Sequence, residues 1–144
     1  MEKEIDPRMH TAEHILNQTM VRLHGCGRCF SAHIEKKKSK CDYRFDRALG
    51  ENELREIERI VNEIIAADDP VTEAYMPRGE AQHYFTLERL PQDAGDTIRI
   101  IRVGDYDSCP CSGPHVQSTG QIGGFRIMSS SFEEGVLRIR YKLA

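Results

Sequence analysis

The sequence lacks any long apolar run. No stretch approaches the roughly 18 consecutive apolar residues that a membrane-spanning helix requires, so we expect no membrane contact. The N-terminus, Met1-Glu2-Lys3-Glu4, is mostly charged, and no apolar signal region follows it. These two absences predict a protein that stays where it is made, which we take to be the cytoplasm.

The sequence also lacks a strong excess of either charge. Its formal net charge is -3 at pH 7, so any contact with nucleic acid must come from a local basic patch. The 144 residues are 39% hydrophobic and 30% charged, which is typical of one soluble globular domain spanning residues 1–144. That length is enough to bury a continuous core without covalent cross-links.

An even cysteine count, typical of a disulfide framework, is missing as well. In a reducing compartment the five cysteines are expected to be thiols or metal ligands. Cys26 and Cys29 form a C-x-x-C pair that would make a second zinc site with Cys41 or Cys109. The alternative is two reduced thiols in a turn.

Helical and strand patterns are mixed along the chain. Asp6 and Pro7 are a helix cap and first residue, apolar residues then recur at helical spacing, and Gly25 ends the pattern. A second helix is predicted over 51–67 and a short one over 79–88. Strands are predicted over 28–34, 41–47, 71–76 and 98–103, with two more within 121–142 that turn near Glu134 and Gly135. The mixture predicts an α+β fold with a mainly antiparallel sheet and packed helices.

Two histidines share one face of the first predicted helix. His10 and His14 are one turn apart, a spacing that suits two ligands of one metal ion, and Asn17 continues that face. The alternative is a pair of helix-surface histidines.

A second pair of candidate ligands lies far along the chain. Cys111 and His115 are four residues apart, and Gly113 and Pro114 between them favour a turn that points both side chains toward one place. One thiolate and three imidazoles form a set of ligands that prefers zinc to magnesium or calcium. We therefore predict that His10, His14, Cys111 and His115 bind Zn2+ and form the catalytic centre.

The same motifs resemble a known family. Residues 10–16, 111–116, 119–125 and 135–139 are similar, in this order, to motifs of the editing domains of threonyl- and alanyl-tRNA synthetases and their free-standing alanyl-type relatives. The resemblance implies the editing-domain fold and a hydrolase that acts in trans. Its substrate would be the ester that joins serine or glycine to mischarged alanine tRNA. A homodimer is a further expectation.

One position departs from the family pattern. In the threonyl form an acidic residue lies two positions before the metal-binding cysteine, whereas Cys109 occupies that place here and the nearest acid is Asp107. A catalytic role for that acid therefore does not carry over. Cys109 is also a competing candidate ligand, although the spacing of Cys111 and His115 matches the motif.

The catalytic and substrate-binding groups beyond the metal ligands are less constrained by the sequence. Glu13 is a candidate general base, with a supporting or solvent-facing carboxylate as the alternative. Four protein ligands close a zinc site, so either one ligand yields to activate water or zinc anchors the substrate amine. The predicted substrate-binding residues are His33, Asn17, Thr119 and Gly123, with ordinary structural roles as the alternative.

A basic run provides the predicted tRNA contact. Lys36, Lys37, Lys38 and Lys40 cluster in a predicted hairpin loop, and arginines alternate along later strands at 99, 102, 126, 138 and 140. The alternative is a solvated turn and a charged sheet face.

Two rival functions remain open. His10, Glu13 and His14 match the inverted zincin pattern, which would make the chain a metallopeptidase. Zinc that is purely structural would instead hold together a module that binds tRNA or a synthetase without catalysis.

Overall fold

The first helix begins and ends where its capping residues place it. The computed structural model describes residues 5–87, 90 and 95–144. Helix α1 spans Pro7–His24, and the Asp6 side chain accepts hydrogen bonds from the backbone N–H groups of Arg8 and Met9. Gly25 closes the helix with φ of 65°, a left-handed conformation that glycine adopts without strain. The predicted start and stop of this helix are confirmed.

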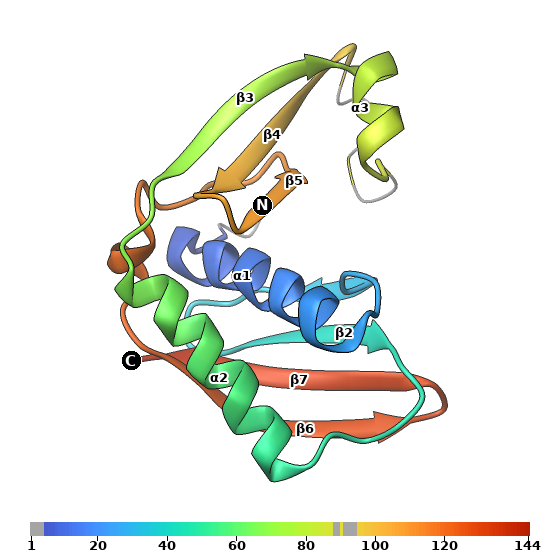
Figure 1. Cartoon of the computed structure of the whole chain (residues 1–144), viewed down its shortest axis with the longest axis vertical. Helices are drawn as coiled ribbons and strands as arrows, with labels where there is room; N and C mark the ends of the chain where they lie inside the picture. The colour runs from blue at the N-terminus through green and yellow to red at the C-terminus, as the bar shows by residue number, and fades with distance from the viewer. Residues whose placement is uncertain (1–4, 88–89, 91–94) are drawn as a thin grey trace.

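A four-stranded antiparallel sheet carries the main core. Its order is β1-β2-β7-β6, and the strands span Ser31–His33 (β1), Ser39–Arg44 (β2), Phe125–Glu133 (β6) and Val136–Leu143 (β7). Helix α2, Glu51–Ala66, lies against this sheet and next to α1 (Figure 1). Its buried residues Leu54, Ile57, Val61 and Ile65 recur at helical spacing, so one face packs into the core while the charged face meets solvent.

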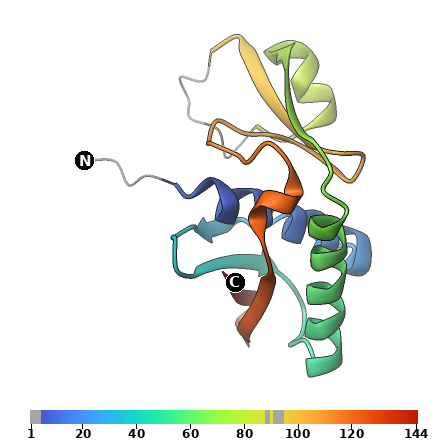
Figure 2. The ribbon, with the colours of Figure 1, turned by 90° about the vertical axis from the view of Figure 1, so that its left-hand side faces the viewer.

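A three-stranded antiparallel sheet lies on the other side of α1. It has the order β3-β4-β5, with strands at Val71–Pro77, Thr97–Val103 and Asp107–Pro110, and the short helix α3, Arg78–Tyr84, packs at its end. Figures 1 and 2 show α1 between the two sheets. The buried residues Ala81, Ile98 and Ile100 form a small separate core here.

The predicted α+β class with antiparallel sheets and packed helices is confirmed. Several bounds were wrong. Both strands of the first hairpin are shorter than predicted, and the second begins at Ser39 instead of residue 41. Beyond the two strands, Arg28 pairs with Asp107 and Arg47 pairs with Glu53. The short helix ends at Tyr84, and residue 88 of that prediction lies outside the described residues.

Two elements were not predicted. Strand β5 contains Asp107, Ser108 and Pro110, residues with low strand propensity, and forms because it pairs with β4. A 3-10 helix, η1, spans Thr119–Ile122 and replaces the beginning of the strand expected from residue 121. Among the described residues no helix is both long and apolar enough to cross a membrane.

Candidate metal centre

Four candidate ligands from two segments that are distant in the sequence meet beside helix α1. His10 and His14 lie one turn apart on α1, and Cys111 and His115 lie in the turn that follows β5. One nitrogen or sulfur atom from each of the four lies within 4.8 Å of the others. His10, His14 and Cys111 are buried and His115 is half-buried, so the cluster is largely shielded from bulk water. The structure thus brings together the four residues that the sequence predicts as ligands.

In two of the histidines, the hydrogen-bond partner of Nδ1 determines which ring nitrogen carries the proton. His10 Nδ1 lies 3.0 Å from the Pro114 carbonyl oxygen, which only accepts, so Nδ1 carries the proton. The Thr11 hydroxyl donates to the Pro7 carbonyl at 2.9 Å, so its oxygen accepts from His115 Nδ1 at 2.9 Å. In both rings Nε2 therefore presents a lone pair toward the cluster centre.

The third histidine is oriented by a buried ion pair. His14 Nδ1 has no hydrogen-bond partner, yet it lies 3.6 Å from Asp107 Oδ2, an electrostatic contact too long for a hydrogen bond. Arg28 donates hydrogen bonds to the Asp107 carboxylate from both terminal guanidinium nitrogens, at 2.7 and 3.2 Å. A carboxylate behind an imidazole fixes the orientation of the ring and raises its basicity as a ligand.

The donor set fits a zinc ion. The Nε2 atoms of His10 and His115 lie 3.3 and 3.4 Å from Cys111 Sγ, and both present lone pairs, whereas one thiol proton can satisfy only one of them. Zinc bonds of about 2.0 Å to nitrogen and 2.3 Å to sulfur place tetrahedral ligand atoms about 3.5 Å apart. A shared cation therefore satisfies lone pairs that the protein alone leaves facing one another.

The electrostatics favour the ligating form of the cysteine. Burial raises the pKa of the Cys111 thiol, but the neighbouring imidazoles of His10, His115 and His14 outweigh it and lower that pKa to about 3. Burial lowers the pKa of His14, whereas Asp107 and Cys111 raise it, to about 9. Burial lowers the pKa of His115 to about 4, which leaves its imidazole neutral near pH 7. Thiolate and neutral imidazole are the forms that bind zinc, so Cys111 and His115 are already in the ligating form near pH 7, whereas His14 would release a proton on binding the metal.

Cys109 has a different environment from Cys111. Burial raises the pKa of its thiol to about 12, so it is a neutral thiol near pH 7, and it is not part of the four-residue cluster. The structure therefore does not support Cys109 as a ligand that competes with Cys111 for the metal.

The turn that carries Cys111 and His115 is held in place by Arg99. The Arg99 guanidinium donates to the Gly113 carbonyl at 2.7 Å, and the Cys111 backbone N–H donates to the Arg99 backbone carbonyl at 3.1 Å. A Cβ atom at Gly113 would overlap Cε1 of the His10 ring. This position therefore requires glycine because the ring of a candidate ligand lies directly against the backbone.

A cavity of about 490 Å³ opens beside the cluster. Its walls are lined by three of the four candidate ligands and by residues from the loop after α1, the segment after α3 and the 109–113 stretch: Ile5, His10, Glu13, His14, Gly27, Arg28, Cys29, Phe30, Thr86, Leu90, Cys109, Pro110, Cys111, Ser112 and Gly113. Glu13 is buried, and its Oε1 accepts from Asn17 Nδ2 at 3.3 Å. A carboxylate, a guanidinium and the metal ligands thus face one partly open space.

The structure places the predicted substrate-binding residues away from this cavity lining. Asn17 is fully buried, where its Oδ1 accepts from the Tyr43 hydroxyl at 2.7 Å. Thr119 is also fully buried and its hydroxyl donates to the Ile64 carbonyl at 2.8 Å. Gly123 has φ of 87° beside the chain end, and His33 is exposed on β1 with its Nε2 3.0 Å from Glu35. Their role in substrate binding stays a prediction.

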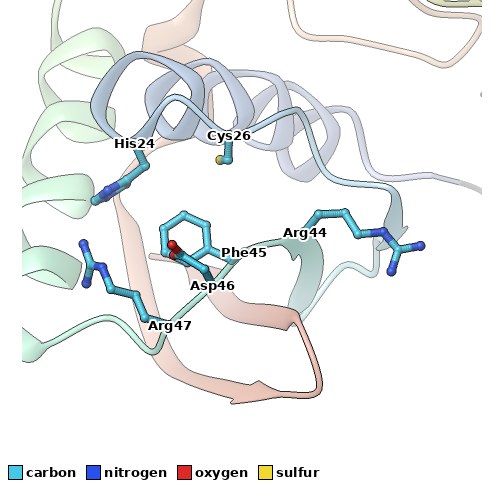
Figure 3. A pocket seen from close by; sticks show the side chains of 6 residues that line it. All are labelled: His24, Cys26, Arg44, Phe45, Asp46 and Arg47. Atoms are coloured by element: carbon cyan, nitrogen blue, oxygen red, sulfur yellow. The ribbon is translucent and has the colours of Figure 1, made fainter.

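The remaining predicted residues are spread over the surface and the core. Lys36, Lys37 and Lys38 are exposed in the turn between β1 and β2, and Lys40 is half-buried on β2. Cys26, Cys29 and Cys41 do not join a second metal-binding group in the part of the chain that the structure describes. Figure 3 shows a separate hollow of about 480 Å³ near the end of α1, lined by His24, Cys26, Arg44, Phe45, Asp46 and Arg47.

Sequence reasoning missed three residues that organise the centre. Arg28, Asp107 and Arg99 come from a loop and two strands that meet only in the folded chain. Asp107 had a signal, because an acid four residues before a candidate cysteine ligand belongs to the same local segment. Arg28 and Arg99 had none, since their partners are 79 and 14 residues away.

The fold and the site together define an α+β protein with a largely buried His/Cys cluster that could hold a metal ion. The threonyl and alanyl tRNA synthetase second additional domain matches residues 98–140, the segment that contains Cys111 and His115. The chain is similar to alanine–tRNA ligases and matches this domain over residues 98–140, which confirms the resemblance seen in the motifs.

Three relatives illustrate how much of the chain is shared. The alanine–tRNA ligase of Treponema denticola is 34% identical over 139 residues, which covers 91% of this chain and 22% of that protein. That of Methanopyrus kandleri is 33% identical over 142 residues, 93% of this chain and 15% of the relative. That of Fervidobacterium nodosum is 34% identical over 134 residues, which covers 92% of this chain and 16% of the relative. The chain thus spans less than a quarter of the length of these relatives.

Proposed function

We propose that this chain hydrolyses, in trans, the ester that joins a wrong amino acid to alanine tRNA, with serine or glycine as the amino acid removed and Zn2+ as the cofactor. The proposed setting is the cytoplasm, where mischarged tRNA would be encountered. The kinship with alanine–tRNA ligases supports the choice of alanine tRNA.

One observation carries the proposal. His10, His14 and Cys111 form part of the wall of a partly open cavity instead of being packed inside a core, and Glu13 and Arg28 share that wall. A metal that serves only to stabilise a fold needs no cavity, whereas a reaction centre needs access for its substrate.

The residues around the cavity have two proposed roles: some bind the metal and others act on the substrate. His10, His14, Cys111 and His115 would hold zinc, which acts as a Lewis acid and lowers the pKa of water toward about 7 when bound. The Glu13 carboxylate is oriented by Asn17 and lies within the cavity wall, where it can take a proton from water or from the substrate amine. Phe30 provides an apolar wall that limits water access.

The test compares alanine tRNA charged separately with serine, glycine and alanine. We expect the zinc-loaded protein to release serine or glycine at least about 100-fold faster than buffer alone, to spare alanine, and to lose this activity after chelation. Glu13→Gln should slow hydrolysis by roughly 100-fold while zinc content stays the same, because general acid–base catalysis contributes about that much. Unchanged hydrolysis in zinc-free protein would contradict the proposal.

A second candidate is a zinc-stabilised module that binds tRNA or a synthetase without catalysis. The four-residue donor set supports it, because four protein ligands complete a structural zinc site. This candidate predicts zinc binding and tRNA affinity with no release of any of the three amino acids. The metallopeptidase alternative is disfavoured, since no carboxylate belongs to the described cluster.

A further inference from the structure

One face of the four-stranded sheet is strongly basic. Side chains alternate along β2, β6 and β7, and those that point away from α1 and α2 form the surface that we name the outer face: Lys40, Asp42, Arg44, Arg126, Ser129, Ser131, Glu133, Val136, Arg138, Arg140 and Lys142. It carries six cations and two acids, in a chain with a net charge of -3. Positive charge is therefore concentrated here against the balance of the whole molecule.

Like charges face each other across neighbouring strands of this surface. Lys40 is the partner of Arg140 in the pairing of β2 with β7, and Arg126 is the partner of Lys142 in the pairing of β6 with β7. Directly opposed like charges destabilise a sheet by roughly the few tenths to one kcal/mol that opposite charges contribute. An arrangement that costs stability at two positions is expected where the charges serve to bind something.

The cations are only partly neutralised by the protein. Arg138 pairs with Asp42 through Nε and one terminal nitrogen, at 2.7 and 2.9 Å. Glu133 lies at the end of β6, in the same row of the sheet as Val136 and Arg44. Arg140 hydrogen-bonds to the Ser129 hydroxyl, at 3.4 Å, and interacts electrostatically with Asp42. The centre of the outer face thus presents hydroxyls and guanidinium groups, which are the donors that phosphate oxygens accept from.

The outer face is continuous with the mouth of the cavity. The guanidinium of Arg44 lies 3.9 Å from the centre of the Phe30 ring, and Phe30 lines the cavity beside the candidate metal centre. The exposed lysines of the turn between β1 and β2 extend the same basic surface at its other end. A chain that followed this surface would reach the cavity at Phe30.

We propose that the outer face binds the phosphate backbone of the RNA whose 3′ end enters the cavity, with Phe30 and Arg44 at the passage from one to the other. The inference rests on the proposed function for the identity of the RNA, and it extends the tRNA contact from the lysine run to the whole sheet face. Spaced cations on an extended strand surface match the regular spacing of phosphates. An aromatic ring at the passage offers a stacking surface to an unpaired base.

The test measures binding, so it does not depend on catalysis. The variant Arg126→Ser, Arg140→Ser, Lys142→Ser removes three cations of the outer face, and the control Arg59→Ser removes an exposed cation of α2. The probe is fluorescently labelled, uncharged alanine tRNA, titrated by anisotropy at salt concentrations from 50 to 200 mM. We expect the triple variant to bind at least about tenfold more weakly and the log–log salt slope to fall by about one per lost phosphate contact.

The stability of the variants separates a binding surface from a structural one. Because the triple variant removes both opposed like-charge pairs, its Tm should stay the same or rise while its affinity for tRNA falls. Unchanged affinity, or an equal loss in Arg59→Ser, would overturn the proposal. Binding of phosphatidylserine vesicles that falls in the triple variant while tRNA binding does not would assign the face to membrane lipid instead. If no ester is hydrolysed but the binding loss is seen, the proposed reaction fails and the RNA surface stands.

Discussion

The two sheets differ in how well each is supported by its own core. The four-stranded sheet packs on α1 and α2 through fully buried side chains such as Leu16, Ile57 and Ile139. The three-stranded sheet has a small core at Ala81, Ile98 and Ile100, and Tyr75 and Tyr84 are exposed on its elements. Since stability scales with buried apolar area, the second region depends more on its attachment to the rest of the molecule.

The candidate metal centre lies where these two regions meet. His10 and His14 belong to the well-packed helix, whereas Cys111 and His115 follow the last strand of the less supported sheet. The ion pair between Arg28 and Asp107 joins the same two regions at 2.7 Å. A bound metal would therefore fasten one region to the other, and losing it should affect the two regions unequally.

The largest expected effect comes from removing a ligand. Cys111→Ser should reduce zinc content to background and ester hydrolysis by at least about 100-fold, because the thiolate is the strongest donor of the set. Hydrogen exchange should rise in β4 and β5 while β7 keeps its protection. The control is Cys26→Ser, a half-buried cysteine outside the cluster. Equal loss of protection in both sheets would break the comparison drawn above.

Gly113→Ala is expected to have the next largest effect. The added methyl group overlaps the His10 ring, so the ring or the turn must move and the lone pair of Nε2 no longer points to the common centre. Zinc affinity and hydrolysis should both fall by at least about tenfold, as expected when a ligand is misoriented. Gly79→Ala, where nothing lies within 4 Å of the added atom and which is outside the cavity wall, is the matched control. Normal zinc affinity in Gly113→Ala would show that the turn adapts.

The secondary structure was predictable wherever local signals agreed. Asp6, Pro7 and Gly25 set the bounds of α1 through capping chemistry alone, and the apolar spacing from Leu54 to Ile65 identified α2. Strand β5 was not predictable, because Asp107 and Pro110 oppose strand formation locally and only the pairing with β4 overrides them. The separation into two sheets likewise depends on long-range pairing that no local pattern encodes.

The candidate ligands could be named from the sequence, but their surroundings could not. A helical spacing of four residues and a turn containing Gly113 and Pro114 limit where the ligand side chains can point. The residues that orient them, Arg28, Asp107 and Arg99, act across distances in sequence that carry no motif. Asn17 shares the helical face of the histidines, yet Tyr43 engages its amide inside the core, so sharing a face did not place it in the cavity wall.

Asp107→Asn tests whether the buried carboxylate supports His14. The amide keeps the shape but removes the charge that lies 3.6 Å from Nδ1, so zinc affinity should fall by about 10- to 100-fold. Because the substitution also leaves Arg28 without its ion pair, Arg28→Met is measured alongside to separate the two effects. Asp105→Asn, an exposed neighbour, is the control. Zinc affinity that falls equally in Arg28→Met and Asp107→Asn would assign the effect to the ion pair instead of to His14.

The smallest expected effects come from trimming one methyl group in each core. Ile139→Val and Ile100→Val each remove a buried methyl group, which costs about 0.5–1.5 kcal/mol where the removed group was well packed. Ile139 lies in the main core, so its substitution should lower the free energy of global unfolding whether or not zinc is bound.

Ile100→Val should behave differently because its core is small and a bound metal would limit the opening of its sheet. With zinc present, we expect the change to show mainly as faster hydrogen exchange in β3 and β4, with little change in global unfolding. After chelation, that local effect should grow, since the attachment at Cys111 and His115 no longer opposes opening of the sheet. If Ile100→Val lowers global stability as much as Ile139→Val with zinc and without it, the two sheets unfold as one unit. The metal would then act on the reaction alone and not on the joint between the regions.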